Sequence, residues 1–322
     1  MLDVISIGAA TEDVFVYVPL KNFAKDMCVF YPGTKIDIEG MEYFTGGGAT
    51  NTSVGLSRLG VRAGIMCAVG NDESAQTILS ELKKERVDSK NVIKLKGTHT
   101  SYSVILTGFG RDRVILCYSN SHQMFAASKN KIKNLKAKWF YITSLHSDGK
   151  MLREIAKRAK KIGAKIALNP GQKELALGLD GISRIFGKVD ILLVNSHEAL
   201  KLTGSTDTQR NLLKLLKICR IVVITCGKEG AYATDGANSY YMKPFDVKIA
   251  DVTGAGDAFG SGFMGAVIKG KGLGRSIEWG TANASSVVMY FGTKNELLGQ
   301  SGIGKFIKKY KRKENAIRIE KL

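Results

Sequence analysis

Short apolar runs that alternate with amphipathic segments constrain the fold of this 322-residue chain more than any other feature. Most of the runs are continuously apolar, which is typical of β-strands covered on both faces. The alternation therefore predicts an α/β fold, with a mostly parallel sheet and helices on both sides. The expected strands are Val4–Ile7, Ala63–Ala68, Val114–Tyr118, Trp139–Thr143, Lys165–Leu168, Ile191–Val194 and Ile221–Thr225. The expected helices are Ser74–Glu85, Gly149–Lys161, Ser196–Lys201 and Asn211–Lys217.

Two segments depart from this alternation. Residues 14–44 hold aromatic or alternating runs without a helical pattern, and residues 98–118 indicate two strands around a glycine- and arginine-rich turn. We expect them to form a small separate β-sheet inserted into one domain that spans residues 1–322. The stretch 301–322 has eight lysines and arginines against two glutamates, with apolar residues at helical spacing. This pattern predicts a basic amphipathic helix at the C-terminus.

Composition and charge narrow the class of protein. No apolar window is long enough to cross a membrane, so we expect no membrane partner. The first residues resemble a β-strand and lack the basic flank and cleavage site of a signal peptide. The five cysteines are scattered, which favours reduced thiols in a cytoplasmic protein. The net charge of +19 would attract nucleic acid or an anionic substrate, but no nucleic-acid motif accompanies it, so no specific nucleic-acid partner is expected.

The segment Asp251–Phe263 is the most informative, because its glycine-rich turn leads directly into a helical pattern. Gly254 and Gly256 let the backbone approach a ligand closely. The free amides of the first helical turn, together with the helix dipole, form a site suited to phosphate. Asp257 lies inside this cradle, where a carboxylate has a task if it takes a proton from a substrate hydroxyl. The simpler alternative is an aspartate that caps the helix.

This segment resembles the C-terminal signature of the ribokinase-like (PfkB) carbohydrate kinases. Gly46–Asn51 resembles the N-terminal Gly-Gly-x-x-x-Asn signature of the same family. The resemblance covers residues 3–300 and implies a three-layer α/β/α ribokinase-like core with a small inserted β-sheet lid. It also implies ATP-dependent phosphorylation of a hydroxyl group on a small sugar, with Mg²⁺ as a cofactor.

The resemblance assigns catalytic and substrate-binding roles to single residues. Asp257 is the expected general base, and the transferring phosphoryl group would be held by the amides of Gly254, Ala255 and Gly256. Substrate would be bound by Asp13, which follows the first strand, and by three residues of the N-terminal signature: Gly46, Gly47 and Asn51. The simpler alternatives for these residues are a turn cap and a flexible glycine turn.

The resemblance also assigns nucleotide and metal contacts. Asn195 and Glu198 match an Asn-x-x-Glu motif, in which Glu198 would hold Mg²⁺ through water and Asn195 would support it. The same pattern is typical of a helix capping box. The turn that would contact the nucleotide phosphates contains Thr225, Gly227 and Gly230. Asn283 would flank the adenine, and Asp251 would bind a monovalent cation such as K⁺.

The acceptor stays open at this point. A free sugar is the first choice, because Asp13 and Asn51 match the ribokinase-like arrangement, although Thr11 and Gly48 depart from it. A nucleoside is the second choice, because the aromatic segment 14–44 is suited to covering a nucleobase.

The positive charge and two lid arginines, Arg111 and Arg113, make a sugar phosphate the third choice. A non-catalytic nucleotide- or sugar-binding regulator is the alternative outside the enzymes. The resemblance further implies a homodimer formed through the lid, since an exposed sheet edge favours pairing.

Overall fold

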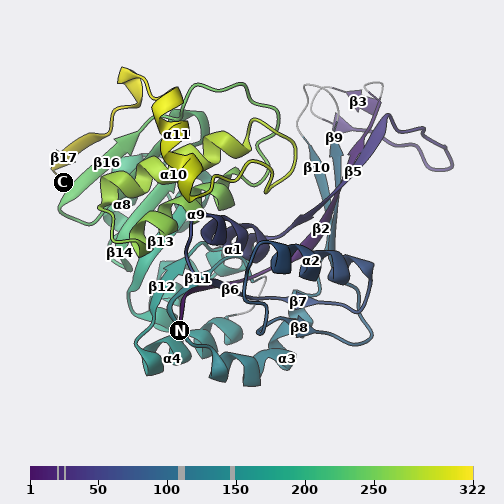
Figure 1. Cartoon of the computed structure of the whole chain (residues 1–322), viewed down its shortest axis with the longest axis horizontal. Coiled ribbons are helices and arrows are strands. Elements are labelled where there is room, and N and C mark those ends of the chain that lie inside the picture. The colour runs from purple at the N-terminus through teal and green to yellow at the C-terminus, as the bar shows by residue number, and fades with distance from the viewer. Residues whose placement is uncertain (20–21, 25–26, 108–112, 146–148, 322) are drawn as a thin grey trace.

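Apolar strands form a nine-stranded sheet at the centre of the computed structural model (Figure 1). The structure describes residues 1–19, 22–24, 27–107, 113–145 and 149–321. In spatial order the strands are β17 (Arg318–Lys321), β16 (Asn238–Met242), β15 (Ala231–Thr234), β14 (Cys219–Thr225), β13 (Val189–Asn195), β12 (Lys165–Leu168), β11 (Ala137–Ile142), β1 (Leu2–Ile7) and β6 (Ala63–Met66). Neighbours from β6 to β14 pair in parallel, and those from β14 to β17 pair antiparallel. The predicted α/β class with a mostly parallel sheet is confirmed.

Helices cover both faces of this sheet, because successive strand residues point to opposite sides. In β11, Phe140 and Ile142 join one apolar cluster, whereas Trp139 and Tyr141 join the other. The first face is covered by α3 (Ser121–Asn134), α4 (Lys150–Ile162), α5 (Gln172–Leu175), α6 (Gly178–Phe186), α7 (Ser196–Thr203) and α8 (Thr208–Leu215). The second face is covered by α1 (Gly48–Arg58), α9 (Ala255–Ile268), α10 (Leu273–Val287) and α11 (Gln300–Tyr310). The expected three-layer core is therefore present.

A second sheet projects from one end of the core (Figure 1). We call it the lid sheet; its strands, in order, are β10 (Val114–Tyr118), β9 (Ser101–Thr107), β2 (Thr11–Tyr17) and β5 (Gly40–Gly46). These strands lie close to the expected insertions, but β2 begins and β5 ends a few residues outside the expected range. The apolar run of β10 is exposed along its whole length, although its sequence is as continuously apolar as that of a core strand.

The remaining elements are short, apart from one helix. Helix α2 (Glu73–Lys84) packs its apolar face near the base of the lid sheet. Two two-stranded pairs are formed by β3 (Phe23–Ala24) with β4 (Met27–Cys28) and by β7 (Ala68–Val69) with β8 (Ile93–Lys94). Short 3₁₀ turns cover Gly227–Glu229 and Lys313–Asn315.

The C-terminal segment differs from the expected single helix. Helix α11 ends at Tyr310, where Lys311 turns to an extended conformation. The side-chain Nδ2 of Asn315 then donates to the carbonyl oxygen of Pro244, and the chain continues into β17. Strand β17 pairs with β16, so hydrogen bonding to an available sheet edge outweighs the helical tendency of the basic sequence.

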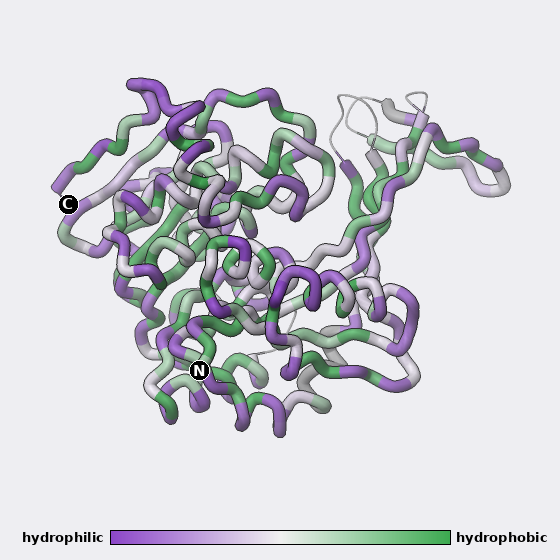
Figure 2. The backbone as a smooth tube through the Cα atoms, viewed as in Figure 1, coloured by the Kyte–Doolittle hydropathy of each residue, from purple (hydrophilic) through white to green (hydrophobic). Residues whose placement is uncertain are grey.

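Hydropathy follows this arrangement (Figure 2). Hydrophobic segments lie mainly in the strands of the core sheet, and hydrophilic segments lie along the outer loops and helix surfaces. Within the described part of the chain, no helix combines the length and the apolar character needed to cross a membrane.

Close packing of α9 against its neighbours fixes the position of this helix. A Cβ added to Gly260 would overlap the hydroxyl of Tyr141 on β11, and one added to Gly262 would lie 2.5 Å from the carbonyl oxygen of Trp279 on α10. Gly265 makes a similarly close approach to α1. The absence of a side chain at these three positions lets α9 lie directly against the sheet and both neighbouring helices.

Replacing Phe306 with Ala tests the packing of the C-terminal helix. The Phe306 ring is 9% exposed and packs edge-on against Phe245, with ring centroids 5.7 Å apart. Loss of the ring leaves a cavity, so we expect the free energy of unfolding to fall by about 3 kcal/mol. Urea unfolding measures this change. The control, Lys305→Ala on the exposed side of α11, should change it by less than about 0.5 kcal/mol; equal effects would contradict the packing.

Candidate active site

The N-terminus of α9 presents the expected anion cradle. Gly254 precedes the helix with a φ of 81°, and an added Cβ would lie 2.8 Å from the Cα of Thr293, so both backbone shape and space require glycine here. An added Cβ at Gly256 meets nothing within 4 Å, which shows that this side of the turn is open. The amide of Ala255 donates to the carbonyl oxygen of Val252 at 3.2 Å, so an anion would compete with that turn. The other amides of the first turn lack intrahelical acceptors.

Asp257 lies in the first turn of α9 and is half-buried. Its Oδ2 accepts a hydrogen bond of 2.8 Å from Nδ2 of Asn51 on α1. Burial raises the pKa of Asp257 above its ordinary value; the Asn51 hydrogen bond and the charge of Lys294 oppose this rise, and the charge of Asp13 adds to it. The two sequence signatures therefore meet at one carboxylate whose proton affinity is increased, as a general base requires.

Asp13 lies on β2 of the lid sheet, where its side chain is 6% exposed. Its Oδ1 accepts a hydrogen bond of 2.9 Å from the hydroxyl of Thr11, and burial raises its pKa. An added Cβ at Gly46 would overlap the Asp13 carboxylate, and one at Gly47 would lie 2.5 Å from the carbonyl oxygen of Ala9. These glycines therefore allow the end of β5 to pack against the carboxylate that is expected to bind substrate.

The expected nucleotide-binding residues lie at the carboxyl ends of neighbouring parallel strands. Asn195 ends β13 and Thr225 ends β14, and the two residues are partners in the strand register. Open α/β sheets bind ligands at this edge. Gly227 and Gly230 have φ values of 54° and 98° in the turn that follows, and an added Cβ at Gly230 would overlap the carbonyl oxygen of Met242.

Asn195 and Glu198 form a reciprocal capping box at the start of α7. The amide of Glu198 donates to Oδ1 of Asn195 at 2.8 Å, and the amide of Asn195 donates to Oε2 of Glu198 at 2.9 Å. The structural alternative considered from the sequence is therefore present. The capping contact uses Oε2, so Oε1 remains for a metal-bound water. Burial raises the pKa of Glu198.

The two carboxylate oxygens of Asp251 differ in their hydrogen bonding. Its Oδ1 accepts hydrogen bonds from the amide and the hydroxyl of Thr253, at 3.0 and 2.8 Å. Its Oδ2 is buried without a hydrogen-bond partner. A buried carboxylate oxygen without a donor is costly, and a bound cation would satisfy it.

Asn283 does not lie where a residue that flanks adenine is needed. Its side chain is fully buried between α9 and α10. Its amide nitrogen donates to the carbonyl oxygen of Ala258 and the hydroxyl of Ser261, and its oxygen accepts from the amide of Leu298. The helix interior uses this polar group completely, so we correct the expected role to a structural one.

Sequence reasoning missed a group of polar residues around Asn51. Thr293 and Lys294 lie between α10 and α11; the hydroxyl of Thr293 donates to Oδ1 of Asn51 at 2.9 Å, and Nζ of Lys294 lies 3.4 Å from the same atom. Glu81 on α2 lies 3.3 Å from that Nζ. No signature or periodicity marks these residues, because each contact joins segments far apart in the sequence.

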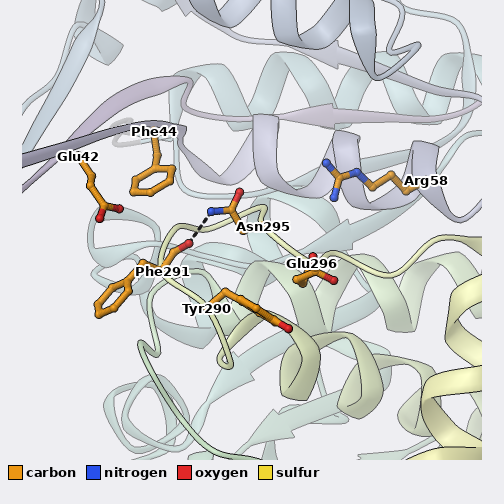
Figure 3. A pocket seen from close by; sticks show the side chains of 7 residues that line it. All are labelled: Glu42, Phe44, Arg58, Tyr290, Phe291, Asn295 and Glu296. Carbon is orange, nitrogen blue, oxygen red and sulfur yellow. Dashed lines mark hydrogen bonds between the residues drawn. The ribbon is translucent and has the colours of Figure 1, made fainter.

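A surface cavity of about 590 Å³ lies beside the site and does not include Asp13 or Asp257 (Figure 3). It is lined by Glu42, Phe44, Arg58, Tyr290, Phe291, Asn295 and Glu296. The charged groups of the two signatures converge at the α9 N-terminus and not in this cavity. Of the two lid arginines, Arg111 lies outside the described residues.

Comparisons with known proteins agree with this geometry. The model of the pfkB family carbohydrate kinases matches residues 1–298. A 5-dehydro-2-deoxygluconokinase from Clostridium perfringens is 30% identical over 292 residues, which cover 83% of this chain and 85% of that relative.

Two solved structures share the fold. A nucleoside kinase from Methanocaldococcus jannaschii has a TM-score of 0.79 at 22% identity, over 96% of this chain and 99% of that one. A ribokinase from Arabidopsis thaliana, complexed with ribose and ATP, has a TM-score of 0.79 at 19% identity, over 95% and 99%. With the family match over most of its length, the chain belongs to the pfkB family of carbohydrate kinases and is an ATP-dependent phosphotransferase.

Proposed function

We propose that this enzyme transfers the γ-phosphoryl group of ATP to a hydroxyl group of a small free sugar, and that the whole chain works as one kinase domain. The hydrogen bond between Asn51 and Asp257 carries this proposal, because it joins the two signatures at one carboxylate. Asp13 on the lid sheet is close enough for its charge to raise the pKa of Asp257. Two carboxylates, one on the lid sheet and one on α9, suit a polyol, whose hydroxyls donate hydrogen bonds to both.

In the proposed mechanism each protein group has one task. Asp13 accepts hydrogen bonds from substrate hydroxyls and orients the sugar. Asp257 accepts the proton of the attacking hydroxyl as its oxygen bonds to the γ-phosphorus and the bond to the β-phosphate oxygen breaks. The amides at Gly254 and Gly256 stabilise the negative charge on the transferring group. Positioning and electrostatics supply most of the rate enhancement in such a reaction.

The nucleotide is proposed to lie along the carboxyl edge of the core sheet, against the turn at Thr225. Glu198 would hold Mg²⁺ through a water molecule, and bound Mg²⁺ supplies positive charge to the phosphates. The use of ATP and the five unpaired cysteines support a cytoplasmic location.

A nucleoside is the second candidate acceptor, favoured by aromatic rings near Asp13. In the lid sheet, Phe44 lies opposite Asp13 in the strand register and therefore on the same face. Further along that face, the ring of Tyr17 packs edge-on against Phe291, with centroids 5.9 Å apart. Partly exposed aromatic rings beside a hydroxyl-binding carboxylate offer a surface on which a base stacks.

Replacing Asp257 with Asn tests the proposed base. The variant keeps the hydrogen-bonding shape but accepts no proton, so we expect kcat to fall by about 10²–10⁴-fold while ATP still binds. A coupled phosphoryl-transfer assay over free pentoses and hexoses, sugar phosphates and nucleosides measures this loss and identifies the acceptor. The matched control is Asp207→Asn at the exposed N-cap of α8, where Asn caps equally well. Equal turnover of the Asp257 variant and wild type would remove Asp257 from the mechanism.

Replacing Asp251 with Ala tests the proposed cation site. The unpartnered Oδ2 supports a site for K⁺, close in the chain to the α9 cradle. We expect K⁺ to raise the activity and the Tm of the wild type, because a ligand that binds only the folded state stabilises it. The variant should show neither response. A wild-type Tm and activity that are the same in K⁺ and in a large organic cation would contradict the site.

The lid sheet is proposed as a homodimer surface. Its outer face carries two cross-strand rows of apolar side chains, which include the exposed residues Met41, Tyr43, Val114 and Leu116, and Tyr118 lies beside them on the same face. Hydrophobic segments along β9 and β10 are visible in Figure 2. An exposed apolar face beside an unpaired edge strand is typical of an association surface.

Replacing Leu116 with Lys tests this surface. Buried in a dimer, the added charge would be unpaired, so we expect the variant to sediment as a monomer where the wild type sediments as a dimer. Leu213→Lys on α8 is the matched control, since both leucines are 55% exposed. A wild type that is monomeric at all accessible concentrations, or a dimer that survives the Leu116 change, would reject the lid interface.

A further inference from the structure

Lys294 is a buried lysine in the loop between α10 and α11. Its side chain is 5% exposed, which is rare for lysine unless the charge has partners. Burial lowers its pKa, and the carboxylates of Glu81, Asp13 and Asp257 oppose that change. The chain therefore holds a positive charge inside the site, at a position that the proposed mechanism has not used.

The ammonium group of Lys294 has an acceptor for each of its three hydrogens. Its Nζ donates to the backbone carbonyl of Thr45 at the end of β5, lies 3.3 Å from Oε2 of Glu81 on α2, and lies 3.4 Å from Oδ1 of Asn51 on α1. An ammonium group has three donors and no acceptor. Lys294 is therefore already engaged by the protein and does not offer a donor to substrate phosphate.

These contacts fix which way the Asn51 amide faces. Its Oδ1 receives the hydroxyl of Thr293 and the ammonium of Lys294, so its Nδ2 points to Asp257. A flipped amide would place NH₂ against the ammonium and the carbonyl oxygen against the carboxylate. Both contacts would be repulsive, so only one orientation is compatible with a charged Lys294.

We propose that Lys294 is a positioning residue of the phosphoryl-transfer site: its ammonium holds the Asn51 amide toward Asp257 and links that amide to the root of the lid sheet at Thr45. This inference deepens the proposed function and rests on it. The same ammonium places a positive charge near both functional carboxylates, Asp257 and Asp13. Lys294 touches neither substrate nor nucleotide in this assignment; it acts through the Asn51 amide and through the charge that it places near the two carboxylates.

The electrostatic consequence depends on all the charged groups around Asp257. The charge of Lys294 lowers the pKa of both Asp257 and Asp13. Asp13 faces Asp257 from β2 and raises its pKa, and the Tyr141 hydroxyl on β11 is close enough to feel its charge. Other charges nearby are those of Glu12, which raises the pKa of Asp13, of Glu81 on α2, and of Arg58 on α1. Arg58 donates to the Lys294 carbonyl oxygen and pairs with Glu85.

Lys294→Met removes the charge and keeps most of the side-chain volume. Without the ammonium, the pKa of Asp257 rises, so the acid limb of the kcat/KM profile should move to higher pH by about one unit or more. We expect the loss of activity to be largest at low pH and to diminish as pH rises. Glu81→Gln is the matched control, because it removes a carboxylate that pairs with Lys294. The acid limb of the kcat/KM profile of this variant should stay in place or move to lower pH.

A second measurement is independent of turnover. Carbon-13 NMR of the apo protein follows the Asp257 carboxyl group, assigned by comparison with Asp257→Asn. The resonance should titrate at higher pH in Lys294→Met than in the wild type. If the wild type transfers phosphate to no acceptor in the panel, the proposed function fails, and this titration still decides the role of Lys294.

Two results would overturn the inference. The first is an Asp257 titration that is the same in wild type and Lys294→Met. The second is a loss of kcat that is uniform across pH, which a purely structural lysine would produce. Thermal unfolding checks that the variant is folded; if it is not, Lys294→Gln, which keeps a donor and removes the charge, undergoes the same two measurements.

Discussion

The close packing of α9 is the constraint on which the rest of the site depends. Glycines at 260, 262 and 265 let this helix contact β11, α10 and α1 at the same time. The helix N-terminus is thereby held beside α1, where Asn51 reaches Asp257. A few tenths of an ångström at these contacts would move the anion cradle and the carboxylate together. The position of the site therefore depends on the close packing of this helix.

Much of the fold could be predicted from the sequence, because the patterns that mark its strands and turns are local. Apolar runs of strand length mark the core strands, and the two glycine signatures mark the turns that meet at Asp257. The end of the C-terminal helix could not be predicted, because the basic helical pattern continues past Tyr310. In the structure the chain instead forms a strand that pairs with the edge of β16. The exposure of β10 could not be predicted for a related reason. Its apolar run has the same composition as a core strand, and only its place at the edge of the lid sheet distinguishes it.

The polar interior of the site is less visible in the sequence. Asn283 matched an expected nucleotide position, yet its amide is consumed by the contact between α9 and the loop after α10. Lys294 carried no signature, yet it connects Thr45, Glu81 and Asn51. Such networks depend on which distant segments meet, so the residue type alone does not reveal them. The roles proposed for Asp13, Glu198 and Asp251 remain predictions.

The pairing of β17 with β16 means that the family boundary is not a folding boundary. The family match ends at residue 298, whereas α11 and β17 follow it and complete one side of the core. A protein cut at that boundary would expose the ring of Phe245 and leave β16 as an open edge, ready to add a strand from another molecule. Self-association of such a fragment would therefore result from the missing strand, and it would not be evidence for an interface through the lid sheet. For the same reason, a fusion partner placed after Leu322 would extend from the outermost strand of the sheet. Its linker should therefore have a sequence that does not continue the β-pairing.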